Sequence, residues 1–108
     1  MTLTNIDSIP IPLESIETLH TLKGIYPDTT VKQCIEQLSN NDVLLLMESG
    51  VNNLLIPDFL EVISKLDIHV FALSDDATAR KIEVNDNAIS HLQFVDLCIA
   101  SQRIINWF

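Results

Sequence analysis

Glycine is scarce in this chain, since only two of its 108 residues are glycine. Nucleotide-binding loops need several glycines, because their backbone N–H groups must approach a phosphate closely at the start of a helix. The turns that contain glycine, at 23–27 and 48–51, do not have phosphate-loop spacing. The sequence therefore argues against a nucleotide site, and we expect no cofactor.

Basic residues are also few. Six Lys and Arg residues stand against 15 Asp and Glu residues, which gives a net charge of −9. Direct binding to nucleic acid depends on clustered cationic side chains that neutralise phosphates, and the sequence has no such cluster. An acidic surface suits solubility or docking onto a basic protein face. We therefore expect protein partners and no direct contact with nucleic acid.

Long apolar runs are absent as well. No run reaches the ~18 residues that a membrane-spanning helix requires, so we expect no membrane insertion. The start of the chain has no basic segment, and Asp7, Pro10 and Pro12 interrupt it, which argues against a signal peptide. Cys34 and Cys98 lie far apart in the sequence, which favours reduced thiols over a disulfide. These features together predict a cytoplasmic protein.

Apolar residues, in contrast, are plentiful. They make up 47% of the chain, which is high for a domain small enough to keep much of its surface in water. We expect a partner to cover part of this apolar surface. The length suits one domain at residues 15–108, preceded by an extended, proline-bearing lead-in at residues 1–14.

Strand patterns recur along the domain. The segment 16–22 alternates apolar and polar residues, whereas 43–47 and 69–73 are continuous apolar runs, typical of strands buried on both faces. A-I-S-H-L at 88–92 predicts a weaker fourth strand. I-I-N-W-F at 104–108 predicts a short strand or a docked tail.

Helical patterns lie between these strands. The apolar spacing predicts helices at 31–38, 57–66 and 93–101, with a turn at 48–53 and a short helix or turn at 75–81. The residues expected to face inward on the first two helices are Val31, Cys34, Ile35 and Leu38, then Phe59, Leu60 and Ile63. Alternating strands and helices imply right-handed βαβ units. The predicted fold class is therefore α/β, a small doubly wound, mostly parallel sheet with helices on both faces.

Ligands in such folds bind beyond the carboxyl ends of the strands. The turn after the third strand, Ser74-Asp75-Asp76, holds no glycine, cysteine, histidine or basic residue. We expect Ser74 or Asp75 to cap the following helix, with both carboxylates near its positive end. A carboxylate pair acting as a metal ligand or base is the less favoured alternative, because nothing nearby in sequence completes a metal set.

The histidines and cysteines give little support to a catalytic or metal site. His20, His69 and His91 are scattered without the spacing of a zinc site, so we expect no metal. His20 falls within the first strand, where we expect it to be hydrogen-bonded or to face an interface. Cys34 and Cys98 both fall on the expected inner faces of helices, and both are expected to be small buried hydrophobes.

The C-terminal aromatic residues point to packing or contact with another chain. Trp107 and Phe108 are costly to leave in water, so they either pack back onto the domain or meet another chain. With His20, they are the residues we predict for an interface.

Four short motifs occur together in a familiar order. They are L-H-T-L at 19–22, D-V-L-L-L-M-E-S-G-V at 42–51, V-F-A-L-S-D-D-A-T-A-R at 70–80 and F-V-D-L at 94–97, followed by a terminal segment at 102–107. With them the chain resembles the TusB/DsrH family over about residues 18–108.

The resemblance implies the small DsrE-like α/β fold and a place in a sulfur-relay complex. In TusBCD, three related subunits form a dimer of heterotrimers that passes persulfide sulfur towards 2-thiolation of the tRNA wobble uridine. The homologous DsrEFH assembly serves oxidative sulfur metabolism.

The resemblance also suggests a role for the unusual turn. The sulfur-carrying cysteine of such complexes belongs to the TusD or DsrE subunit, at the end of the strand equivalent to 70–73, where this chain reads F-A-L-S. The chain then resembles a non-catalytic subunit. The implied partners are TusC/TusD- or DsrF/DsrE-type sister subunits in a heterohexamer and a downstream sulfur carrier. Ser49 and Lys81 depart from the family pattern, which commonly has Asp and Gly at these positions.

Two alternatives stay open. Some DsrH-like members carry a cysteine on the first helix, and Cys34 falls in the matching region. Cys34 is therefore the weak candidate for a persulfide carrier in a DsrH-type subunit of sulfur oxidation. The other alternative is a stand-alone homo-oligomeric binding module.

Overall fold

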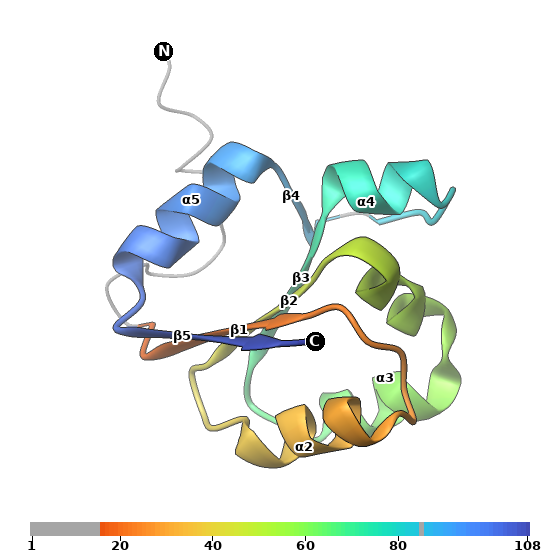
Figure 1. The fold of residues 1–108 in the computed structure, drawn as a ribbon, viewed down its shortest axis with the longest axis horizontal. Helices are drawn as coiled ribbons and strands as arrows, with labels where there is room; N and C mark the ends of the chain where they lie inside the picture. Colours follow the sequence, from red (N-terminus) through yellow and green to blue (C-terminus); the bar gives the residue numbers. More distant parts are fainter. Residues whose placement is uncertain (1–15, 85) are drawn as a thin grey trace.

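The structure is a computed structural model, and it describes residues 16–84 and 86–108. Strands and helices alternate along these residues (Figure 1). In chain order the elements are β1 (Thr18–Leu22), α2 (Thr29–Gln37), β2 (Val43–Leu46), the 3₁₀ helix η2 (Glu48–Leu55), α3 (Pro57–Ser64), β3 (His69–Leu73), α4 (Ser74–Ala79), β4 (Ala88–Ile89), α5 (His91–Ala100) and β5 (Arg103–Trp107).

The strands form a single five-stranded sheet in the order β4-β3-β2-β1-β5, and every neighbouring pair is parallel. Helices α2 and α3 cover one face of the sheet, and α5 covers the other (Figure 1). The α/β doubly wound fold is confirmed. The segment 104–108, for which the sequence predicts a strand or a docked tail, forms most of β5 and lies at the sheet edge beside β1.

The core has two layers, one on each face of the sheet. All four residues of β2 are completely buried, as expected for a central parallel strand. Leu44 and Leu46 pack towards α2 and α3, where they meet Val31 and Phe59. The alternate β2 residues pack towards α5, where they meet Leu97. The continuous apolar run in the sequence therefore supplies both layers.

Local capping explains where two helices begin. The Asp28 carboxylate accepts a hydrogen bond from the Thr29 N–H and starts α2. Ser90 and Gln93 form a capping box at the start of α5, each side chain bonding the other's backbone N–H. The prediction of a strand at 88–92 is therefore wrong beyond Ile89, because Ser90 turns the chain into a helix.

Three further predictions are corrected. Residues 48–53 are not a simple turn, because η2 continues as a 3₁₀ helix to Leu55. The predicted cap by Ser74 or Asp75 is wrong, since α4 begins after Leu73 without a side-chain cap hydrogen bond. Leu60 does not face inward, because the short α3 turns it outward and leaves it 42% exposed.

Glycine is required at one position in the turn after β2. A Cβ atom on Gly50 would lie 2.2 Å from the Leu22 carbonyl oxygen, so no larger residue fits without a shift of the backbone. The predicted lead-in at 1–14 lies outside the described residues. Across the described ranges, no helix has the length and apolar character needed to cross a membrane.

Candidate functional site

The carboxyl ends of β1, β2 and β3 lie at one edge of the sheet, where parallel α/β proteins bind their ligands. The turn after β1 and the turn after β2 are joined by an ion pair and a hydrogen bond. Lys23 Nζ lies 3.2 Å from Glu48 Oε2, and the Ser49 hydroxyl donates to the Lys23 carbonyl at 2.8 Å. These contacts hold the start of η2 against the end of β1.

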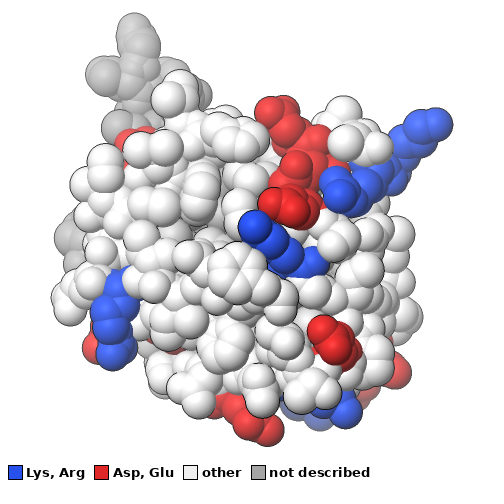
Figure 2. All heavy atoms as spheres, in the orientation of Figure 1, with Lys and Arg blue, Asp and Glu red and all other residues white. Residues whose placement is uncertain are grey.

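The third turn contributes its two carboxylates. Asp76 Oδ2 accepts a hydrogen bond of 2.6 Å from the Glu48 backbone N–H and so ties α4 to η2. Asp75 Oδ2 lies 3.5 Å from His91 Nδ1, between two exposed side chains. Figure 2 shows acidic and basic side chains gathered next to one another near α4, with much of the remaining face uncharged. Asp75, one of the two predicted caps, instead lies near His91 at the start of α5, and Asp76 bonds to the start of η2.

No thiol lies at the end of β3. The two cysteines are on helices, and Cys34 is completely buried within α2 against the core. Burial raises the pKa of the Cys34 thiol to about 12 from its ordinary value of 9.0. Cys98 on α5 is only partly buried, so the expectation of a buried residue is right for Cys34 and wrong for Cys98, although burial raises the pKa of the Cys98 thiol as well. A nucleophilic cysteine needs a stabilised thiolate, and both environments favour the neutral thiol instead.

His20 is hydrogen-bonded, which is one of the two alternatives predicted for it, and it is part of a buried chain whose other members the sequence does not reveal. The Trp107 indole Nε1–H donates to His20 Nδ1 at 3.1 Å, and His20 Nε2 lies 3.0 Å from Asp42 Oδ2. An indole nitrogen can only donate, so His20 Nδ1 must be the unprotonated nitrogen and Nε2–H must donate to Asp42. The chain thus runs from Trp107 through a neutral imidazole to the Asp42 carboxylate.

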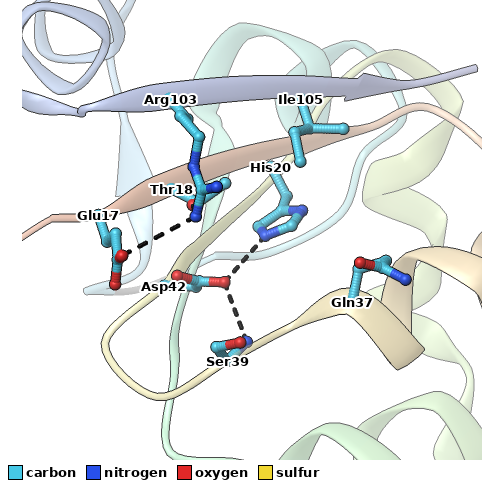
Figure 3. A pocket seen from close by; sticks show the side chains of 8 residues that line it. All are labelled: Glu17, Thr18, His20, Gln37, Ser39, Asp42, Arg103 and Ile105. Atoms are coloured by element: carbon cyan, nitrogen blue, oxygen red, sulfur yellow. Dashed lines mark hydrogen bonds and ion pairs between the residues drawn. The ribbon is translucent and has the colours of Figure 1, made fainter.

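A pocket of about 210 Å³ lies beside this chain. It lies beside the amino-terminal halves of β1 and β5 and the α2–β2 loop, away from the edge where ligands were expected (Figure 3). His20 and Asp42 form its inner wall, and their side chains are 1% and 4% exposed. Arg103 lies at its side, where Nη2 donates to Thr18 Oγ1 at 3.1 Å and lies 3.9 Å from Glu17.

The residues predicted for an interface lie on β1, on β5 and directly after β5. His20 is buried and hydrogen-bonded, and Trp107 packs against the core as the donor to His20. Phe108 is 75% exposed, with Lys23 Nζ 5.2 Å from the centre of its ring. Whether these residues meet a partner stays a prediction.

The histidines and cysteines predicted as unlikely metal ligands are not brought together. Across residues 16–84 and 86–108, no group of three or more His, Cys, Asp or Glu side chains is arranged to hold a metal ion. His20 has Asp42 and Trp107 as its partners, and His91 has Asp75.

The comparisons with known proteins support the fold and the family resemblance. The family model described as DsrH like protein matches residues 24–104. Among solved structures, the solution NMR structure of protein Tm0979 from Thermotoga maritima is similar, with a TM-score of 0.56 and 22% identity. That match covers 76% of this chain and 91% of the other, and at this identity it supports the fold alone. No curated protein matches the sequence.

Proposed function

The chain belongs to the DsrH-like family, and on that premise we propose that it is a non-catalytic subunit of a sulfur-relay assembly of the TusBCD or DsrEFH type. Members of this family are in general sulfur-relay subunits that work in complexes with sister subunits. The proposed sisters are of the TusC/TusD or DsrF/DsrE type. A downstream sulfur-carrier protein would receive the sulfur from the complex.

The observation that carries the non-catalytic role is the end of β3. There the chain continues directly from Leu73 into Ser74 and two acids. The family resemblance implies that the sister subunit of such complexes carries its sulfur at this position. A persulfide forms on a thiolate, and Ser74 offers only a hydroxyl. The added negative charge of Asp75 and Asp76 would also oppose an anionic sulfur nucleophile. This turn supports a scaffold role better than a transfer role.

The surface of α5 supports a role in a complex. Leu92, Val95 and Ile99 lie at helical spacing on the outer side of α5 and are 66%, 50% and 78% exposed. The opposite side of the same helix buries Leu97 against the sheet. Figure 2 shows the surface over α5 as largely uncharged. An apolar outer face on a helix that already covers the core is typical of a protein contact.

Between the two pathways, we propose 2-thiolation of the tRNA wobble uridine. The proposal rests on the TusB side of the family resemblance. With a net charge of −9, the chain is not suited to bind the phosphates of tRNA, so the tRNA would be modified by a later component. The acidic surface instead suits contact with a basic protein face.

Co-expression tests the proposal. The tagged chain is produced with and without the TusC/TusD-type sister subunits from the same source, and the purified material is analysed by size-exclusion chromatography with light scattering. We expect the chain to co-purify with both sisters in a heterohexamer, and to self-associate or lose solubility when it is alone. A monodisperse monomer or homo-oligomer that ignores its sisters would instead favour a stand-alone module.

A further inference from the structure

The two oxygens of the Asp42 carboxylate in the pocket differ in their hydrogen bonding. Both of its side-chain hydrogen bonds, from His20 Nε2–H and from the Ser39 backbone N–H at 2.9 Å, end on the same oxygen, Oδ2. Figure 3 shows both dashed lines meeting at that oxygen while the other points away from His20 and Ser39. No donor within residues 16–84 and 86–108 bonds to Oδ1. A buried carboxylate oxygen without a donor is costly, which makes Oδ1 a binding point.

The charge of Asp42 is not balanced by a cation. His20 donates to it as a neutral imidazole, because its Nδ1 accepts the Trp107 N–H. Among the described residues, no Lys or Arg nitrogen lies within 4.0 Å of the Asp42 carboxylate, and Arg103 is engaged with Thr18 and Glu17. Glu17, Asp42 and Arg103 are the charged residues of the pocket wall, so the wall carries an excess of negative charge.

We propose that this pocket binds a small cationic nitrogen donor, a guanidinium or an ammonium group, on Asp42 Oδ1. The volume of about 210 Å³ accommodates a group of this size, and the polar side chains of Gln37 and Thr18 line its walls. Such a donor would give Asp42 Oδ1 its missing hydrogen bond and would also neutralise the buried negative charge. A charge-assisted hydrogen bond of this kind is stronger than a bond between neutral groups. This site is distinct from the carboxyl edge of the sheet and does not depend on the sulfur-relay role.

The chain contains its own reporter for this site. Trp107 is the only tryptophan, so its indole N–H gives a single NMR resonance. This N–H is coupled to Asp42 through His20, and the Ser39 amide bonds to Asp42 directly. Titration of the full chain with methylguanidine at millimolar concentrations should shift both resonances along saturable curves. Acetate at the same concentrations should leave them in place.

Two matched comparisons make the test specific. Methylurea has the shape of methylguanidine without its charge, and it should bind at least about ten-fold more weakly, since the bond it makes is no longer charge-assisted. The Asp42→Asn variant keeps an acceptor for His20 and Ser39 and should weaken methylguanidine binding by a similar factor. The Asp67→Asn variant removes an exposed carboxylate outside the pocket and should bind like the native chain.

The cation could come from an arginine side chain of another protein or from a free small molecule, and a peptide probe distinguishes these two sources. Acetyl-Gly-Arg-Gly-amide should bind at least as tightly as methylguanidine if the natural occupant is an arginine side chain of another protein. It should fail to bind, while methylguanidine saturates, if the occupant is a free small molecule. The proposal is overturned if methylguanidine gives no saturable shift, if methylurea binds equally well, or if a folded Asp42→Asn variant binds unchanged.

Discussion

Trp107 and His20 are 87 positions apart in the sequence, yet they share a hydrogen bond of 3.1 Å between the indole Nε1–H and the imidazole Nδ1. Their ring planes are nearly parallel, 14° apart. The bond links the last strand to the first, because Trp107 lies on β5 and His20 on β1. It also fixes the imidazole tautomer that donates to Asp42.

This hydrogen bond predicts that Trp107 contributes to the stability of the folded chain. The Trp107→Phe variant keeps an aromatic ring but leaves the buried His20 Nδ1 without a donor. The free energy of unfolding should fall by about 1–3 kcal/mol, measured by urea denaturation followed by circular dichroism. Phe108→Ala is the neighbouring control and should cost at most about 1 kcal/mol, because Phe108 is 75% exposed and its ring makes a cation–π contact with Lys23. Equal losses in the two variants would contradict the role assigned to the hydrogen bond.

The hydrogen bonds of Asn53 predict that it contributes more to stability than its neighbour Asn52. The buried amide Nδ2 of Asn53 donates to the carbonyls of Gly24 and Gly50, each at 2.9 Å, and its Oδ1 accepts the Tyr26 N–H at 2.8 Å. Asn53→Ala should lower the free energy of unfolding by about 3 kcal/mol, since three backbone groups lose a partner. Asn52→Ala, in the same 3₁₀ helix, removes a single bond to Ser49 and should cost about 1 kcal/mol. A loss from Asn53→Ala no larger than that from Asn52→Ala would show that water replaces the amide.

Burial of Cys34 predicts a pH dependence of stability. Because the pKa of its thiol is raised to about 12 in the folded chain from 9.0, the neutral thiol is favoured by folding. The resulting stability is fully present below pH 9 and is lost as the pH rises from about 9 towards 12. Urea denaturation between pH 8 and 11 should therefore show a steeper loss for the native chain than for Cys34→Ala, by up to about 1.4 kcal/mol per pH unit.

The control for this pH dependence is Cys98→Ala, which should keep most of the native slope, because Cys98 is only partly buried. Parallel pH profiles for the native chain and Cys34→Ala would mean that the Cys34 thiol ionises as it does in the unfolded chain. The same result would reopen Cys34 as a sulfur carrier.

The apolar side of α5 predicts where the sister subunits bind. Ile99→Glu places a charge on its most exposed member and should weaken co-purification with the sisters by about 30-fold or more, the effect of losing a central contact. Leu55→Glu changes a similarly exposed residue, at 65%, on η2 and should leave the assembly intact. Circular dichroism confirms that both variants fold. An assembly that tolerates Ile99→Glu but not Leu55→Glu would move the interface to η2.

The sequence predicts the sheet well where burial alone decides the structure. The run at 43–46 is apolar because β1 and β3 cover both of its edges and helices cover both of its faces, and such a run is readable without a structure. The run at 69–73 forms the predicted strand but is buried only from Phe71 onward, because His69 is exposed and β4 pairs only with Ala72 and Leu73. The strand predicted at 88–92 is right for Ala88 and Ile89 and wrong beyond them, although S-H-L-Q at 90–93 has the pattern of a capping box. That signal was available in the sequence and would have placed the start of α5 correctly.

The pocket could not be predicted in the same way. Asp42 and His20 are 22 positions apart, and their contact depends on the pairing of β1 with β2. Trp107 joins them only because β5 returns to lie beside β1 and not at the other edge of the sheet. Strand order of this kind is a property of the whole fold, so periodicity in one segment carries no sign of it. These residues also lie away from the carboxyl edge of the sheet, where α/β folds usually bind their ligands.

The most direct test of the account is mass spectrometry of sulfur on the reconstituted complex. The chain and its sister subunits are incubated with cysteine, a cysteine desulfurase and the upstream carrier, and each intact subunit is weighed before and after reduction. We predict that a reducible gain of one sulfur atom appears on the TusD- or DsrE-type sister and that Cys34 and Cys98 stay unmodified. A reducible persulfide on Cys34 of this chain, lost in Cys34→Ser together with transfer to the downstream carrier, would contradict the account.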